Sequence, residues 1–297
     1  METVERHKRV GLVLSGGGAR GFAHIGVLRV LEESGIEVDV VAGTSIGAIL
    51  AALYAHGYGA EDLHLVASGL KWRDIVDLSL QGGLIKGEKL GQFLSTYLPP
   101  RFEDLARPLA VTTTDVESGE EVILFEGDLI SAVRASSCFP GAFQPVELKD
   151  RTLADGGIIN NLPVEAAAFL GASFTIASDA TPPRRSSYSD GQEDGNWWER
   201  MVATVRLERR SPMVQMLLRS SDIMQSILTD IQYTMHPADV LVKLDMPEIR
   251  VESFREYDRI VALGEAAARR AFGAAGLLGA PAAEAGERRA TAHDLGS

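Results

Sequence analysis

Cysteine is almost absent from this 297-residue chain. Its one cysteine, Cys138, has no partner for an internal disulfide, so a disulfide scaffold is excluded and a reducing compartment fits. Long hydrophobic runs are also missing: the most apolar stretch, residues 40–55, is shorter than the roughly 18–20 residues that span a bilayer. The first ten residues carry charges but no apolar segment, unlike a secretory signal. We therefore expect a cytoplasmic protein, with peripheral contact to a membrane left open.

Positive charge is in deficit, since 29 Lys and Arg residues face 41 Asp and Glu residues, a net charge of −12. Nucleic-acid binding is disfavoured, because such proteins neutralise phosphates with Lys and Arg. The hydrophobic share of 45% is ordinary for a globular protein, and we see no internal repeat.

Alternating strand and helix patterns predict an α/β fold. The apolar run at 10–14 stops at a glycine-rich turn, and a helical stripe over 25–31 ends near Gly35, a typical residue just past a helix end. A second buried strand is expected at 38–41, followed by a helix at 48–55. Strand–helix–strand–helix over this length indicates a parallel sheet.

Later segments continue the same pattern. Strands are expected at 109–113 and 121–125 as a hairpin, at 153–155, at 174–177 and at 240–244; helices at 90–98, 128–135, 164–170, 212–233 and 254–272. Residues 181–196 read as a polar loop. One face of the 212–233 helix is apolar, and the relevant residues are Met213, Leu217, Met224, Ile227 and Ile231.

The glycine-rich turn, Gly16-Gly17-Gly18-Ala19-Arg20-Gly21, has three possible interpretations. It matches the dinucleotide-binding pattern G-x-G-x-x-G, but the acidic residues at the right distance, Glu37 and Asp39, lie at the start of the second strand and not at its end. A P-loop fails because no Gly-Lys-Ser/Thr follows. Alternatively, backbone N–H groups of the turn stabilise an oxyanion in acyl transfer. A plain strand-to-helix turn is the third possibility.

A second motif, Gly43-Thr44-Ser45-Ile46-Gly47, has the form G-x-S-x-G. It follows a strand and opens an Ala-rich helix, the strand–turn–helix that exposes a nucleophilic serine. The Ile46 N–H is then a candidate oxyanion donor beside Gly17 and Gly18.

A base for Ser45 is not found among the histidines. His236 and His293 follow the serine without a surrounding motif, and His24 is better explained as a packing or hydrogen-bonding residue. Asp155, at the end of a strand in Leu153-Ala154-Asp155-Gly156-Gly157, is an alternative proton acceptor if burial tunes it. An ordinary Asp-Gly turn is the competing interpretation.

Together, the motifs at 16–21, 43–47 and 155–157 resemble the patatin-like phospholipases, specifically the bacterial branch related to neuropathy target esterase. Residues 135–143 resemble that family's A-S-x-x-x-P-G segment. The resemblance implies a three-layer α/β sandwich with a mainly parallel central sheet and a Ser–Asp dyad without histidine. It implies Ser45 as nucleophile and Asp155 as base, and the matching oxyanion-hole segment is Gly16, Gly17, Gly18 and Arg20.

The function implied is hydrolysis of carboxylic esters of lipids, phospholipid or lysophospholipid, through an acyl-enzyme, with no cofactor and no metal. The predicted organisation is a catalytic domain at 10–180, a polar linker at 181–200, a helical extension packed on it at 201–273, and a disordered tail at 274–297. Trp197, Trp198 and the apolar face of the 212–233 helix could touch a membrane; packing of this face on the sheet is the favoured alternative. A non-catalytic partner-binding protein on the same fold, or a dinucleotide-binding one, are the competing functions.

Overall fold

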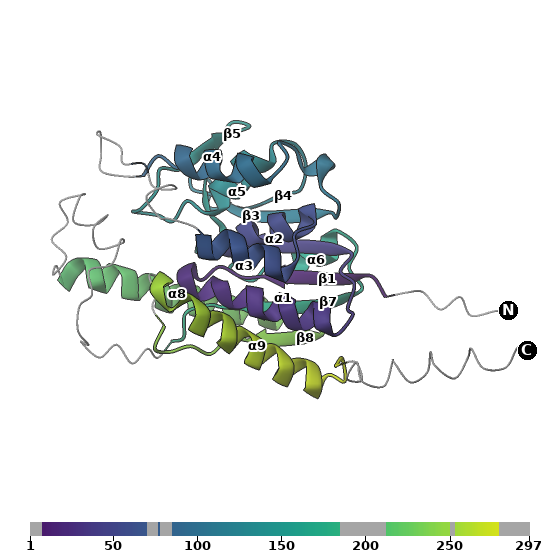
Figure 1. Cartoon of the computed structure of the whole chain (residues 1–297). Coiled ribbons are helices and arrows are strands. Elements are labelled where there is room, and N and C mark those ends of the chain that lie inside the picture. Colours follow the sequence, from purple (N-terminus) through teal and green to yellow (C-terminus); the bar gives the residue numbers. More distant parts are fainter. Residues whose placement is uncertain (1–7, 70–76, 78–84, 185–211, 250–252, 279–297) are drawn as a thin grey trace, which may run out of the picture.

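The computed structural model describes residues 8–69, 77, 85–184, 212–249 and 253–278 (Figure 1). Within them, eight strands form one sheet in the order β5-β6-β3-β2-β1-β7-β8, with β4 also paired to β3. The strands are β1 Val10–Leu14, β2 Val40–Thr44, β3 Leu109–Asp115, β4 Glu121–Leu124, β5 Val146–Leu148, β6 Arg151–Asp155, β7 Phe174–Asp179 and β8 Val240–Lys243. The run β3-β2-β1-β7-β8 is parallel.

Helices cover both faces of the sheet. They are α1 Ala23–Glu33, α2 Ile46–His56, α3 Ala60–Gly69, α4 Glu88–Tyr97, α5 Leu129–Ser136, α6 Val164–Phe169, α8 Pro212–Met235 and α9 Tyr257–Ala274. Side chains alternate along β1: Leu12 and Leu14 pack in one core with α1, α2 and α9, whereas Val13 packs in another with α6. The predicted three-layer α/β sandwich with a mainly parallel sheet is confirmed.

Strand β3 pairs with three strands, and two of them share one of its edges. Along β3, Thr112 pairs with Thr44 of β2 and Ile123 of β4, while Thr113 pairs with Asp155 of β6 and with Val122 of β4. Since β4 occupies one edge at both positions, β2 and β6 must share the other edge. β2 runs parallel to β3 and β6 antiparallel, so the C-terminal ends of β2 and β6 meet head-on.

Some predicted boundaries shift. The second strand was expected at 38–41 but runs to Thr44, and Asp39 stays outside it, where its carboxylate accepts a hydrogen bond from the Val10 N–H at 2.6 Å. The predicted hairpin at 109–125 is β3–β4, with β4 at the sheet edge.

Two elements have no counterpart in the prediction, α3 and β5. β5 and β6 form a hairpin whose two-residue loop, Lys149-Asp150, has positive φ at both positions (50° and 62°). Such a loop usually carries Asn-Gly, so the sequence offered no turn signal here.

The C-terminal helix packs tightly on the first one. A Cβ at Gly264 of α9 would lie 2.0 Å from the Ala23 carbonyl oxygen, and one at Gly26 of α1 would lie 2.1 Å from that of Val261. Reciprocal glycines therefore let the two backbones approach closely. Most of residues 181–200 and 274–297 lie outside the described residues, and the division into domains stays a prediction.

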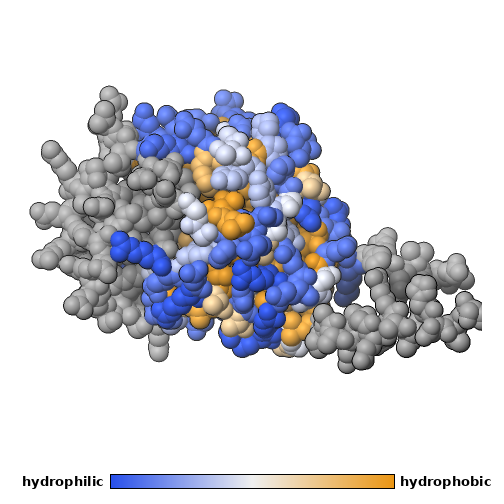
Figure 2. Space-filling model, viewed as in Figure 1, coloured by the Kyte–Doolittle hydropathy of each residue, from blue (hydrophilic) through white to orange (hydrophobic). Residues whose placement is uncertain are grey.

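The molecular face seen in Figure 2 is mostly hydrophilic, with small groups of hydrophobic residues between the charged ones. No helix in the described ranges combines the length and the apolar character needed to cross a membrane.

Candidate active site

Ser45 is the single residue between β2 and α2, and its backbone conformation is strained. Its φ of 56° and ψ of −127° lie in a region that residues with a side chain rarely adopt. The flanking glycines make room for this sharp turn: a Cβ at Gly43 would come within 2.7 Å of the Gly47 carbonyl oxygen, and one at Gly47 within 2.2 Å of the Leu14 carbonyl oxygen. The turn thus presents the Ser45 side chain at the end of the sheet.

Asp155 ends β6 and faces Ser45 across the meeting point of the two strands. Ser45 Oγ donates a hydrogen bond to Asp155 Oδ2 at 2.7 Å. The other carboxylate oxygen, Oδ1, accepts from the Gly157 N–H at 2.8 Å. Both oxygens of this buried carboxylate are therefore paired, and its orientation is set from both sides.

Burial changes the acidity of Asp155. Loss of solvation raises the pKa of its carboxyl to about 6, against the opposing effect of the hydrogen bonds from Ser45 and Gly157. The carboxylate is then a stronger base than an exposed aspartate and is still mostly ionised at neutral pH.

Ser136 is a part of the site that the sequence analysis did not single out. Its hydroxyl accepts a hydrogen bond from the Ser45 N–H at 2.9 Å and donates one to the Thr112 carbonyl at 2.6 Å. It ends α5, inside the 135–143 segment. Ser136 thereby links Ser45, the candidate nucleophile, to β3, the strand that pairs with both β2 and β6.

The glycine-rich turn lies beside Ser45. A Cβ at Gly16 would lie 3.2 Å from the Ser45 Cβ. The Gly16 N–H donates to the Asn161 carbonyl at 3.1 Å, whereas the N–H groups of Gly17 and Gly18 have no hydrogen-bond partner within the described part of the chain. Ile46 begins α2, so its N–H is at a helix N-terminus next to Ser45. Gly17, Gly18 and Ile46 are the amides available to an anion.

Comparison with known protein families gives a match over much of the chain. The family model described as patatin-like phospholipase matches residues 12–168, which contain the glycine-rich turn, Ser45 and Asp155. The chain belongs to the patatin-like phospholipase family.

Its relatives include an uncharacterized NTE family protein of Mycobacterium tuberculosis, 37% identical over 207 residues, which are 66% of this chain and 56% of that protein. Human patatin-like phospholipase domain-containing protein 6 is 36% identical over 202 residues, 64% of this chain and 14% of that protein. This patatin-like chain thus spans about half the length of its mycobacterial relatives. The predicted family and its NTE-related bacterial branch are confirmed.

Among solved structures, VipD from Legionella pneumophila resembles this patatin-like chain with a TM-score of 0.58 and 15% identity, over 90% of this chain and 67% of that one. This likeness concerns the fold.

Arg20 of the patatin-like motif uses its side chain for a contact within the fold, and its assignment to the oxyanion hole stays a prediction. Its side chain is buried, and its Nε donates to the carbonyl of Ile249 at 2.8 Å. Arg20 therefore links the glycine-rich turn to the segment after β8.

No hydrogen bond joins a described histidine of this patatin-like chain to Ser45 or Asp155. His24 is fully buried, with Nδ1 2.7 Å from Ser178 Oγ and Nε2 2.9 Å from the Ser15 carbonyl, and burial lowers its pKa to about 4. The prediction of a hydrogen-bonded packing residue is confirmed. His236 is exposed after α8, and His293 lies outside the described residues.

The strained backbone at Ser45 predicts a difference in stability between two variants of this patatin-like site. Replacing Ser45 with Gly or with Ala removes the hydroxyl equally, but only Gly adopts the observed φ and ψ without strain. We expect Ser45→Gly to have a free energy of unfolding about 1 kcal/mol larger than Ser45→Ala, after the greater entropy of the unfolded Gly variant is allowed for. Urea denaturation of the two variants measures this difference. An Ala variant as stable as the Gly variant would contradict strain at Ser45.

Proposed function

We propose that this protein is a serine acyl hydrolase that cleaves carboxylic ester bonds of lipids, phospholipid or lysophospholipid, through a Ser45–Asp155 dyad. The observation that carries the proposal is the 2.7 Å hydrogen bond from Ser45 Oγ to a buried carboxylate. A serine hydroxyl becomes nucleophilic when a positioned base accepts its proton. Membership of the patatin-like phospholipase family supports lipid esters as the substrate class.

In the first half of the reaction, Ser45 Oγ attacks the ester carbonyl carbon while its proton passes to Asp155 Oδ2. The carbonyl oxygen gains the negative charge, and the N–H groups of Gly17, Gly18 and Ile46 are the donors that would stabilise it. Collapse of this intermediate breaks the bond to the alcohol, which takes the proton from Asp155 as it leaves. The acyl group is then esterified to Ser45.

In the second half, a water molecule replaces the alcohol. Asp155 takes a proton from this water as its oxygen attacks the acyl carbon, and the same amides stabilise the second oxyanion. Collapse returns the proton to Ser45 Oγ and releases the fatty acid. The hydrogen bond from Gly157 keeps the carboxylate aimed at the same place through both halves.

Helix α8 supports contact with a lipid surface. The favoured expectation that its apolar face packs on the sheet is wrong for the described side chains, since Leu217, Met224 and Ile231 are 60%, 59% and 51% exposed. The helix instead turns polar side chains inward: Ser226 and Thr229 are buried. A helix that exposes its apolar side is typical of an interaction surface.

The inward side of α8 also reaches the site. Gln225 Nε2 donates to the carbonyl of Gly157 at 3.1 Å, two residues from the base. The helix that carries this apolar surface thus contacts the loop after Asp155. Such an arrangement suits an enzyme whose substrate lies in a lipid aggregate. We therefore propose that the outward face of α8 contacts the lipid surface. Trp197 and Trp198, for which membrane contact was also considered, lie outside the described residues.

The dyad predicts that Ser45→Ala and Asp155→Asn each lose ester hydrolysis by at least about 1,000-fold, because the two groups act as a unit. Labelling by a fluorophosphonate probe should require Ser45. His236→Ala is the matched control and should keep most of its activity, as the exposed His236 lies outside the dyad. Comparable turnover in Asp155→Asn would rule the dyad out, and loss of activity in His236→Ala would favour a histidine base.

The pKa of Asp155 predicts the pH dependence. The base works as the carboxylate, so kcat/KM should rise about tenfold per pH unit in acid and level off above an apparent pKa of about 6. A soluble ester assayed from pH 4 to 9 measures this profile. A midpoint near 4, the value of an exposed aspartate, would contradict a desolvated base.

The lipid-facing surface predicts a separable defect. Leu217→Ser, Met224→Ser and Ile231→Ser combined should lower partitioning onto phosphatidylcholine vesicles at least about tenfold, because less apolar area enters the bilayer interface. Hydrolysis of a soluble short-chain ester should stay unchanged. The control variant Leu65→Ser/Phe169→Ser removes two side chains that are each 62% exposed elsewhere on the surface. Equal flotation of the two variants would contradict the assignment of this face.

A further inference from the structure

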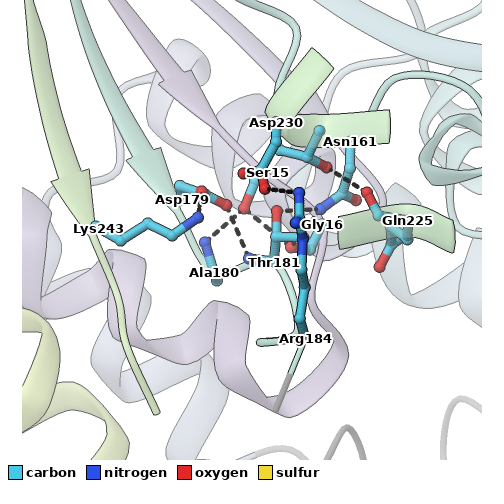
Figure 3. Close-up of polar contacts among 11 residues, drawn as sticks. Ser15, Gly16, Asn161, Asp179, Ala180, Thr181, Arg184, Gln225, Asp230 and Lys243 are labelled. Atoms are coloured by element: carbon cyan, nitrogen blue, oxygen red, sulfur yellow. Dashed lines mark hydrogen bonds and ion pairs between the residues drawn. The ribbon is translucent and has the colours of Figure 1, made fainter. Parts of the chain in front are cut away.

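Asn161 pairs with both main-chain polar groups of Gly16. The main-chain carbonyl of Asn161 accepts a hydrogen bond from the Gly16 N–H at 3.1 Å. Its side-chain Nδ2 donates to the Gly16 carbonyl at 3.2 Å and to Thr181 Oγ1 at 2.9 Å (Figure 3). Because the Gly16 carbonyl is only an acceptor, the side-chain nitrogen must point toward it. The side chain is only 2% exposed, so water offers Gly16 no substitute for these bonds.

The side-chain oxygen of Asn161 lies between the two catalytic loops. A Cβ added at Gly16 would lie 2.3 Å from Asn161 Oδ1, and one added at Gly157 would lie 2.9 Å from it. The same position at Gly16 is 3.2 Å from the Ser45 Cβ. A side chain at Gly16 would collide with this amide, and one at Gly157 would collide with both the amide and Gln225 Nε2, which would lie 2.5 Å away.

Asn161 and the base also belong to one short segment. Asn161 lies six residues after Asp155, and the Asn160 N–H between them donates to the Gly156 carbonyl at 2.8 Å. The segment that carries the base thus also holds the start of the glycine-rich turn. Gly17 and Gly18, whose amides have no partner among the described residues, follow directly.

We propose that Asn161 is a positioning residue for the oxyanion: by holding Gly16 at both its N–H and its carbonyl, it aims the Gly17 and Gly18 amides at the oxygen that becomes charged. This inference rests on the proposed hydrolase function. Asn161 acts through the turn and not on the proton transfer, since no hydrogen bond joins its side chain to Ser45 or Asp155 in the described structure. Both tetrahedral intermediates use the same amides, so the acylation and deacylation steps depend on Asn161 alike.

The experiment compares Asn161→Ala with Thr181→Ala. The first removes the donor to the Gly16 carbonyl; the second removes only the other partner of that nitrogen and is the matched control. We expect Asn161→Ala to lower kcat about 10- to 100-fold with KM within about twofold, since misaimed oxyanion donors cost transition-state stabilisation. Thr181→Ala should stay within about threefold of the natural chain, and the apparent pKa of kcat/KM should not move in either variant.

A trifluoromethyl ketone provides a readout that a loss of folding would not mimic. Ser45 Oγ adds to the ketone carbon, its proton passes to Asp155, and the ketone oxygen becomes an oxyanion with no leaving group. Its affinity, measured per folded molecule, should fall in Asn161→Ala by about the same factor as kcat. An unchanged affinity, or an equal loss in Thr181→Ala, would overturn the proposal.

A double-variant cycle tests the contact directly. Gly16→Ala alone should reduce kcat, because its methyl group would collide with Asn161 Oδ1. In the Asn161→Ala background, Gly16→Ala should lower kcat by a much smaller factor than in the natural chain, since the collision with Asn161 Oδ1 is gone. Fully additive losses would count against the coupling.

The outcomes separate the two proposals. If the natural chain neither hydrolyses esters nor binds the ketone, the hydrolase function fails. If the natural chain does both, and Asn161→Ala has the same kcat and the same affinity for the ketone, only the proposed role of Asn161 fails.

Discussion

The shared edge of β3 is the constraint on which the site depends. β2 and β6 approach along this edge from opposite directions, and they end at Thr112 and Thr113. A strand end is where a side chain can leave the sheet, so two strands that end head-on bring Ser45 and Asp155 into contact. The Thr112 carbonyl anchors Ser136, which in turn holds the Ser45 N–H. The antiparallel direction of β6 therefore places the proposed base, Asp155, at the carboxyl end of β2 in a mainly parallel sheet.

Close backbone approach is the second theme, and it explains most of the glycines that form the motifs. Gly43 and Gly47 let the chain turn sharply at Ser45, while Gly16 and Gly157 leave space for the Asn161 amide. The tight turn strains the backbone at Ser45, and burial desolvates the Asp155 carboxylate. Both features reduce stability, and under the proposed function both would prepare Ser45 as nucleophile and Asp155 as base, a compromise that is usual at catalytic sites.

Much of this could be predicted from residue patterns. The apolar runs, the Gly35 helix end and the order of the three glycine-containing motifs are local signals, and the strands, helices and candidate dyad followed from them. The hairpin at Lys149-Asp150 was missed because its loop lacks the residues such turns prefer. Ser136, Asn161 and Gln225 were missed for another reason: a lone Ser, Asn or Gln has no pattern around it, and its role is a contact with a distant segment.

The sequence by itself determined the hydrophobic period of each element, the family and the two residues proposed as the dyad, because these depend on neighbours along the chain. Only the tertiary structure decided which amides of the glycine-rich turn have no hydrogen-bond partner among the described residues, that Arg20 binds the Ile249 carbonyl, and that α8 turns its apolar side outward. An amphipathic pattern states that one side of a helix is apolar, but it does not state what covers that side. Hydrogen-bond partners and burial are properties of the packed chain, and the packing joins residues more than a hundred positions apart.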